Sequence, residues 1–225
     1  MKYAYLFFTL AFLLAPISTT YAQLVAIPTR TTVEALDQHR AIQVYNNGDK
    51  PLYLDITLQR VDNPGVNPEQ KTLISDISQP EMIFNPNRIT LGPKQKRNIK
   101  LLPLKSPAQE TLYRLYINPV VDIKALGSHE DKSKIHAPMT ISIGYGVLIH
   151  HVPPLTAQIS HWQHQCLPGG HLMLTSTGTV HSKFEQLNSS DKTDSLNLYP
   201  GTPITLSTKQ LSGKVDNETF TVHCD

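Results

Sequence analysis

Apolar and polar residues alternate in short runs along most of the chain. In the segment 53–61, for example, Leu54, Ile56 and Leu58 are separated by single polar residues. A period of two places alternate side chains on opposite faces of a strand, whereas an amphipathic helix repeats about every 3.6 residues. No long run with the helical period occurs, and 17 prolines interrupt the chain. The pattern therefore predicts an all-β protein.

Turn-forming residues divide the chain up to residue 152 into short predicted strands. These are 24–35 with an interruption at Pro28, 39–46, 53–61, one on each side of Gly92-Pro93, 111–121 and 139–152. Strands at such intervals, with no helical pattern between them, predict a Greek-key sandwich of the immunoglobulin type. The polar segment 62–80 is expected to be a long loop.

Composition changes after Pro153-Pro154, where the chain becomes poorer in apolar residues and richer in Ser, Thr and His. We therefore expect an N-terminal immunoglobulin-like domain at 23–153 and a smaller β domain at 154–225. The two cysteines, Cys166 and Cys224, both lie in the second segment. In an exported protein such a pair predicts one disulfide.

The first 22 residues have the features of a cleaved secretory signal. Lys2 supplies a basic start, residues 4–17 are apolar, and Thr20-Tyr21-Ala22 fits a cleavage site. An apolar run of this length is too short to span a bilayer, which takes about 20 residues. We therefore expect an exported protein without membrane insertion, and the bacterial periplasm suits a single disulfide.

Charge and motif content exclude several classes of function. The formal net charge of the full chain is only +2, which argues against a nucleic-acid binder. No nucleophile elbow, HExxH sequence or phosphate loop occurs. The sequence therefore predicts a protein that is not an enzyme and needs no cofactor.

A group of histidines raises the alternative of a metal protein. His161 and His164 stand beside Cys166 in the sequence HWQHQC. Histidine and thiolate are good zinc ligands, but this spacing is not a standard one and Cys166 has a predicted disulfide partner. Exposed strand histidines are the favoured interpretation, so no metal site is predicted.

Two arginines have either a structural or a ligand-binding explanation. Arg114 lies in the middle of the otherwise apolar and aromatic strand TLYRLYINPVV, and Arg30 follows Pro28-Thr29 in the first strand. A partly buried guanidinium needs an anionic or carbonyl partner because it cannot lose its charge. That partner is either a carboxylate of the chain itself or the carboxylate of a ligand.

The strand predicted at 139–152 is unusually long. Met139, Ile141, Ile143 and Tyr145 begin a ridge of alternate apolar residues that continues to Ile149. Strands usually run about 5–6 residues, so the ridge exceeds what its own core needs. We expect Tyr145 and the residues after it to face the core, while the first three side chains fill a groove in another protein. Adding a strand to an incomplete sheet is a known mode of recognition.

Four segments resemble the periplasmic chaperones of chaperone–usher pili, and more closely the alternate branch that serves colonisation-factor-type fimbriae. They are RAIQVYNNGDKPLYLDITLQRVDNPG, FNPNRITLGPKQKRNIKL, ETLYRLYINPV and ISIGYGVLIHHVP. Together they cover most of residues 24–154, whereas the C-terminal part matches only in size and β character.

The resemblance implies two immunoglobulin-like domains in an L-shaped arrangement with a cleft between them. Members of this family bind pilus subunits that lack their last strand and complete each subunit with a strand of their own. They then deliver the subunits to an outer-membrane usher. In this sequence the donor strand would comprise Met139, Ile141 and Ile143, with Tyr145 as a fourth position. Whether the free protein caps itself as a dimer is left open.

The family also anchors the carboxylate at the subunit's C-terminus with cations in the cleft. Arg30 matches the arginine of the first strand. The lysine usual in the last strand is replaced by Leu148, and the nearest ionisable residue is His150. The candidate anchors are therefore Arg30, then Arg114, then His150. The alternative functions are a secreted two-domain adhesin or carbohydrate-binding module, and a metal protein that uses His161 and His164.

Overall fold

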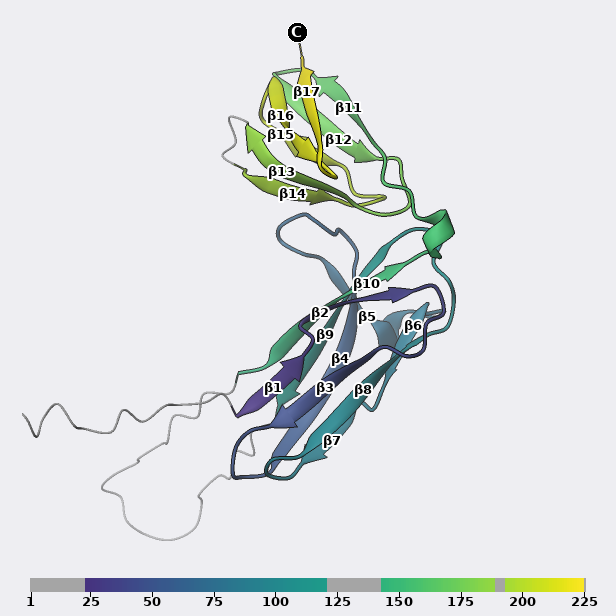
Figure 1. Cartoon of the computed structure of the whole chain (residues 1–225), viewed down its shortest axis with the longest axis vertical. Coiled ribbons are helices and arrows are strands. Elements are labelled where there is room, and N and C mark those ends of the chain that lie inside the picture. The colour runs from purple at the N-terminus through teal and green to yellow at the C-terminus, as the bar shows by residue number, and fades with distance from the viewer. Residues whose placement is uncertain (1–22, 121–142, 189–192, 225) are drawn as a thin grey trace, which may run out of the picture.

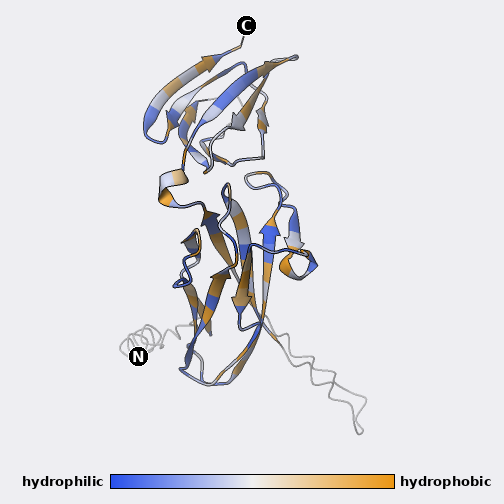
Figure 2. Cartoon of the chain, turned by 90° about the vertical axis from the view of Figure 1, so that its right-hand side faces the viewer, coloured by the Kyte–Doolittle hydropathy of each residue, from blue (hydrophilic) through white to orange (hydrophobic). Residues whose placement is uncertain are grey.

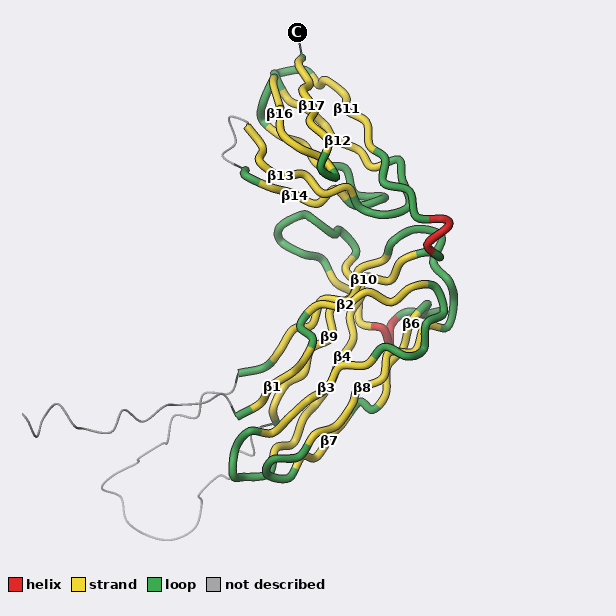
Figure 3. Tube along the Cα trace, viewed as in Figure 1, coloured by secondary structure: helices red, strands yellow, loops and turns green. Residues whose placement is uncertain are grey.

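The chain folds into two β-sandwiches that meet at an angle (Figure 1). The computed structural model describes residues 23–120, 143–188 and 193–224. Within these ranges nearly all regular structure is strand, apart from two short 3₁₀ helices at Ile74–Asp76 and Leu155–Ala157 (Figure 3). The predicted all-β, two-domain immunoglobulin-like fold is confirmed. No helix in the described part of the chain has the length and apolar character needed to cross a membrane.

The first sandwich consists of two sheets. The strands of one sheet, in spatial order, are β1 (Leu24–Ile27), β3 (Ala41–Asn46), β8 (Lys96–Pro103) and β6 (Met82–Asn85). The strands of the other are β2 (Arg30–Glu34), β10 (Tyr145–Val152), β9 (Thr111–Pro119), β4 (Leu52–Val61) and β5 (Lys71–Leu73), with β7 (Arg88–Leu91) also paired to β4. Only β2 and β10 run parallel among the strand pairs of the described residues.

Alternate residues of these strands form one core between the two sheets. Leu54, Ile56 and Leu58 of β4 are all at most 2% exposed, as their alternation predicted. They pack with Tyr113 and Leu115 of β9 and with apolar residues of the facing sheet. Figure 2 shows the apolar residues along the inner faces of this sandwich.

The second sandwich is smaller. One sheet contains β11 (Trp162–Leu167), β12 (His171–Ser176) and β15 (Ile204–Leu206). The other contains β14 (Ser195–Leu198), β13 (Ser182–Asn188), β16 (Gln210–Val215) and β17 (Glu218–His223). Trp162, Phe184 and Phe220 meet edge to face in its core, with ring centroids 5.1 to 5.4 Å apart.

The predicted disulfide is confirmed. Cys166 of β11 bonds Cys224, which directly follows β17, so the bridge joins the two sheets of the second sandwich. The loop that it closes spans 58 positions. A loop of this length contributes about 4 kcal/mol in the chain-entropy model, which suits a domain with a small core.

Two expected elements differ in the structure. The segment 24–35 forms two strands in different sheets, since β1 pairs with β3 and β2 pairs with β10. Pro28 lies between them and has no N–H to continue a ladder, so the chain changes sheets there. The expected loop 62–80 contains the short strand β5 and a 3₁₀ turn.

Candidate functional site

The outer face of the β2-β10-β9-β4 sheet is turned toward the second sandwich. Along β10, Val147 and Ile149 enter the core, so Leu148 and His150 project from the opposite face. Leu148 packs there with Val61 and Leu112 of the first sandwich and with Tyr199 of the second. This small apolar cluster holds the two sandwiches together where they meet.

Arg30 and Arg114 lie in one row across this face. Leu148 of β10 is opposite Arg30 of β2 on one side and opposite Arg114 of β9 on the other. Register partners point to the same face of a sheet, so the two guanidinium groups flank Leu148. Sheet topology thus brings together two residues that are 84 positions apart in the sequence, as their numbers show.

Arg30 is the exposed member of this row. Within the described residues, its side chain has no ion pair or hydrogen bond. An arginine carries five N–H donors in a planar fork, which suits a carboxylate. Arg30 is therefore a cation at the edge of the sheet, and its donors have no partner in the described part of the chain.

Arg114, in contrast, is paired within the chain. Its Nη2 and Nε donate to Oε1 and Oε2 of Glu69 at 2.6 and 3.2 Å. Glu69 belongs to the loop between β4 and β5, and the hydrogen bonds from Arg114 lower the pKa of its carboxyl. The structural explanation that the sequence allowed for Arg114 is therefore present in the fold.

Tyr199 links both arginines to the second sandwich. Burial and the charge of Glu110 raise the pKa of its hydroxyl to about 12, while the positive charges of Arg30 and Arg114 act in the opposite direction. The β4–β5 loop also approaches here, because a Cβ on Gly65 would lie 2.8 Å from the carbonyl oxygen of Asn197. Gly65 has a φ of +84°, a conformation that suits glycine.

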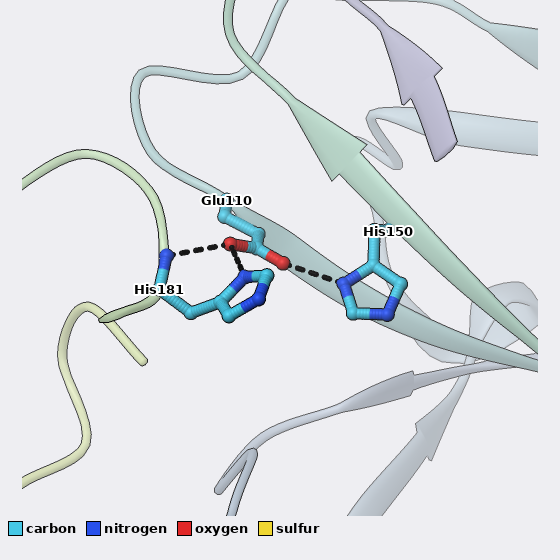
Figure 4. Close-up of side chains that lie close together, drawn as sticks. All are labelled: Glu110, His150 and His181. Atoms are coloured by element: carbon cyan, nitrogen blue, oxygen red, sulfur yellow. Dashed lines mark hydrogen bonds and ion pairs between the residues drawn. The ribbon is translucent and has the colours of Figure 1, made fainter. Parts of the chain in front are cut away.

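A second polar cluster, Glu110, His150 and His181, joins the sandwiches beside this apolar contact (Figure 4). Glu110 immediately precedes β9, and its carboxylate is fully buried. It accepts hydrogen bonds from Nδ1 of His150 at 2.6 Å and from Nδ1 of His181 at 2.7 Å. The backbone N–H of His181 also donates to it at 2.8 Å, and the N–H of Glu110 donates to the carbonyl of Thr179.

The electrostatics of Glu110 reflect this set of donors. Burial by itself would raise the pKa of the carboxyl, but the hydrogen bonds from His150 and His181 outweigh burial and hold the pKa at about 2. The carboxylate therefore stays ionised while it is out of contact with water. His150, a candidate anchor from the sequence, is committed through Nδ1 to this contact between the sandwiches.

The start of β10 has a free edge. Residues 145–147 pair with β9, but β2 begins to pair only at Leu148, and no described strand lies along 145–147 on that side. Tyr145 is partly buried against the core, whereas Ile143 is 73% exposed. The other two expected donor residues, Met139 and Ile141, lie outside the described residues.

The histidines singled out in the sequence do not gather into a site. Among the described residues, the group with metal-ligand proximity is Glu110, His150 and His181, and neither His161 nor His164 belongs to it. Sequence reasoning missed Glu110 and His181 because they are isolated polar residues at strand ends. The isolated glutamate at the start of an apolar strand, ETLYRLY, is the one signal that the sequence offered.

Comparisons with known proteins agree with the sequence resemblance. No protein-family model matches the chain. One CS1 fimbrial protein of Escherichia coli, its B subunit, is 24% identical over 180 residues, which are 71% of this chain and 70% of that protein. One CFA/I fimbrial protein of Escherichia coli, its A subunit, is 26% identical over 113 residues, which are 50% of this chain and 46% of that protein.

Solved structures resemble the chain over most of its length. The class 5 fimbriae chaperone CfaA has a TM-score of 0.68 at 16% identity, covering 90% of this chain and 99% of that one. A complex of the archaic chaperone CsuC with the tip protein CsuE, from Acinetobacter baumannii, matches with a TM-score of 0.57 at 13% identity, covering 90% and 98%. The chain therefore has the two-domain fold of the chaperone–usher fimbrial chaperones, as its sequence motifs predicted.

Proposed function

We propose that the protein is a periplasmic chaperone that folds, caps and delivers pilus subunits to an outer-membrane usher by donor-strand complementation. The observation that carries the proposal is the unpaired edge of β10 at 145–147, which continues into the exposed Ile143. A strand with a free edge and projecting apolar side chains has what a subunit lacking its last strand requires. Solved relatives include complexes of such chaperones with a tip adhesin, a tip protein and a pilin.

Export forms part of the proposal. We infer that residues 1–22 are a cleaved signal, that 23–153 and 154–225 are the two domains, and that the mature protein acts in the periplasm. The disulfide between Cys166 and Cys224 supports an oxidising compartment, because such bonds persist there. No catalytic step enters this function, since binding and release of a strand suffice.

In this proposal the subunit's C-terminal carboxylate binds at the cleft face of the sheet. Arg30 supplies free donors beside the strand that would extend the subunit's sheet. Arg114 lies two strands away in the same row and becomes available when Glu69 moves aside. Leu148 occupies the place of the family lysine between them, so we propose that this chain anchors the carboxylate with arginines. His150 contributes through the position of β10.

The decisive experiment is co-expression with a pilus subunit in the periplasm, using the variant Ile143→Asp. Because Ile143 is 73% exposed, the variant should fold with a change of less than about 0.5 kcal/mol in its free energy of unfolding. We expect the subunit to be degraded and no one-to-one complex to be recovered. Ile159→Asp is the matched control, since Ile159 is 57% exposed near the start of the second sandwich, and it should protect the subunit normally.

Normal subunit yield with Ile143→Asp and with a further variant that also changes Ile141 would overturn the proposal. An adhesin or carbohydrate-binding module would bind a glycan or surface and leave subunit survival unchanged in all variants.

A further inference from the structure

We propose that Glu110, His150 and His181 form a binding site for one divalent transition-metal ion of the zinc class, and that this ion bridges the two sandwiches. Each residue offers a ligand atom, and these atoms all lie within 4.8 Å of one another. The three come from different parts of the fold, because Glu110 precedes β9, His150 belongs to β10 and His181 precedes β13. The site is independent of the proposed binding of pilus subunits.

The donor set suits zinc and disfavours magnesium and calcium. Two imidazole nitrogens and one carboxylate oxygen are common zinc ligands, with a fourth position left for water. Magnesium and calcium prefer sites built from oxygen atoms. The carboxylate of Glu110 is ionised and buried, so it is ready to bind a cation.

The geometry requires only a small adjustment. Without metal, the two Nδ1 atoms lie 2.6 and 2.7 Å from the carboxylate oxygens, which are hydrogen-bond distances. Ligands arranged tetrahedrally around zinc at about 2.0–2.1 Å are about 3.3 Å apart, so each pair must open by roughly 0.6 Å. His181 can supply this movement because it belongs to the second sandwich and its side chain is 31% exposed.

A separate observation indicates that the hydrogen bonds alone leave the cluster incomplete. The side chain of His150 is 8% exposed, and its Nε2 is buried without a hydrogen-bond partner among the described residues. Buried polar atoms without partners are rare and costly. Figure 4 shows the two imidazole rings on either side of the carboxylate, with the second nitrogen of each ring left without a drawn partner.

An ion and its water have a route to this position. A pocket beside Glu110 is lined by residues of both sandwiches, including Gln109, Leu112, Pro200 and Gly201. The exposed part of His181 stands at the surface next to the buried carboxylate. The cluster is thus closed on the side of the first sandwich and open at the seam.

Isothermal titration of the mature, untagged protein with zinc chloride tests the site. We expect one zinc ion per chain, no saturable binding of magnesium, and a higher midpoint of thermal unfolding with zinc present. His181→Asn and Glu110→Gln should each weaken zinc binding at least about tenfold, since loss of even an outer-shell partner costs 10–100-fold at metal sites. His181→Asn is the safer variant because its side chain is partly exposed.

The double variant His161→Asn, His164→Asn is the matched control. These two histidines are exposed on the second sandwich and lie outside the cluster, so zinc binding should be unchanged. The proposal is overturned if the parent binds no zinc in a saturable manner. It is also overturned if folded His181→Asn binds zinc as the parent does, or if the control variant loses the ion.

Discussion

Arg114 donates two hydrogen bonds to the carboxylate of Glu69, one from Nη2 at 2.6 Å and one from Nε at 3.2 Å. The pair lies on the cleft face, in the row that also contains Arg30. Glu69 therefore presents to Arg114 the same chemical group that the proposed pilus partner would present. Its side chain is 26% exposed and belongs to a loop, so a competing carboxylate can reach the guanidinium.

Glu69→Gln should increase the affinity of the chaperone for a pilus subunit. The ion pair that must be broken is partly exposed and is worth at most about 1 kcal/mol, so the gain should stay below about tenfold. The free energy of unfolding should fall by a similarly small amount. Surface plasmon resonance with the pilus subunit and urea unfolding check the two values.

Asp62→Asn is the control for the Glu69 variant. Asp62 pairs with Arg60 at 2.8 Å beside the same loop but makes no contact with Arg114. Its removal should leave the affinity for the pilus subunit unchanged. Equal affinities for Glu69→Gln and the parent would mean that Arg114 serves the fold only.

Arg30→Ala should reduce recovery of the chaperone–subunit complex without unfolding the protein. The side chain is exposed and has no ion pair within the described residues, so its loss should alter the free energy of unfolding by less than about 1 kcal/mol. Affinity purification of the complex and a thermal melt give the two measurements. Arg88→Ala is the matched control, because Arg88 is 85% exposed on β7 and pairs only weakly with Asp55. An unfolded Arg30 variant would indicate a structural role.

Leu148→Ala should destabilise the protein by about 2–3 kcal/mol, because it empties the centre of the apolar contact between the sandwiches. Leu148 is 8% exposed and touches a cluster that includes Tyr199 of the second sandwich. Guanidinium unfolding measures the change, and Leu155→Ala, at a position 71% exposed, should alter stability by less than about 0.5 kcal/mol. A negligible effect of Leu148→Ala would mean that the contact adds little to stability.

Tyr113 should make the first sandwich sensitive to alkali. Burial raises the pKa of its hydroxyl, and the charge of Glu81 raises it further. In the unfolded chain the group ionises near pH 10.0. Stability is therefore complete below that pH and declines above it, by up to about 1.4 kcal/mol per pH unit until the folded pKa is reached.

Chemical unfolding of the parent and of Tyr113→Phe at several pH values on both sides of 10 tests this dependence. The variant should lose less stability at high pH than the parent. Tyr53→Phe should behave as the parent does, because Tyr53 is 56% exposed. The same alkaline slope in Tyr113→Phe and the parent would contradict the prediction.

Alternation of apolar residues predicted which faces of the strands are buried, and the cores of β4 and β9 follow that pattern. The split at Pro28 was visible as an interruption, but its meaning was not. A proline shows where a ladder must stop, whereas the sheet in which the next strand continues depends on partners far away in the sequence. For the same reason the expected donor residue Ile143 could be located, while the free edge beside it could not.

The sequence by itself determined the all-β fold, the disulfide and the four motifs of the chaperone resemblance, because these depend on local period, residue type and spacing. Tertiary structure alone decided that Arg114 meets Glu69, 45 positions away, and that Glu110 meets His181, 71 positions away. A strand pattern specifies the face on which a side chain lies but not which residue stands opposite. That choice follows from sheet order and register, which are set by the packing of the whole chain.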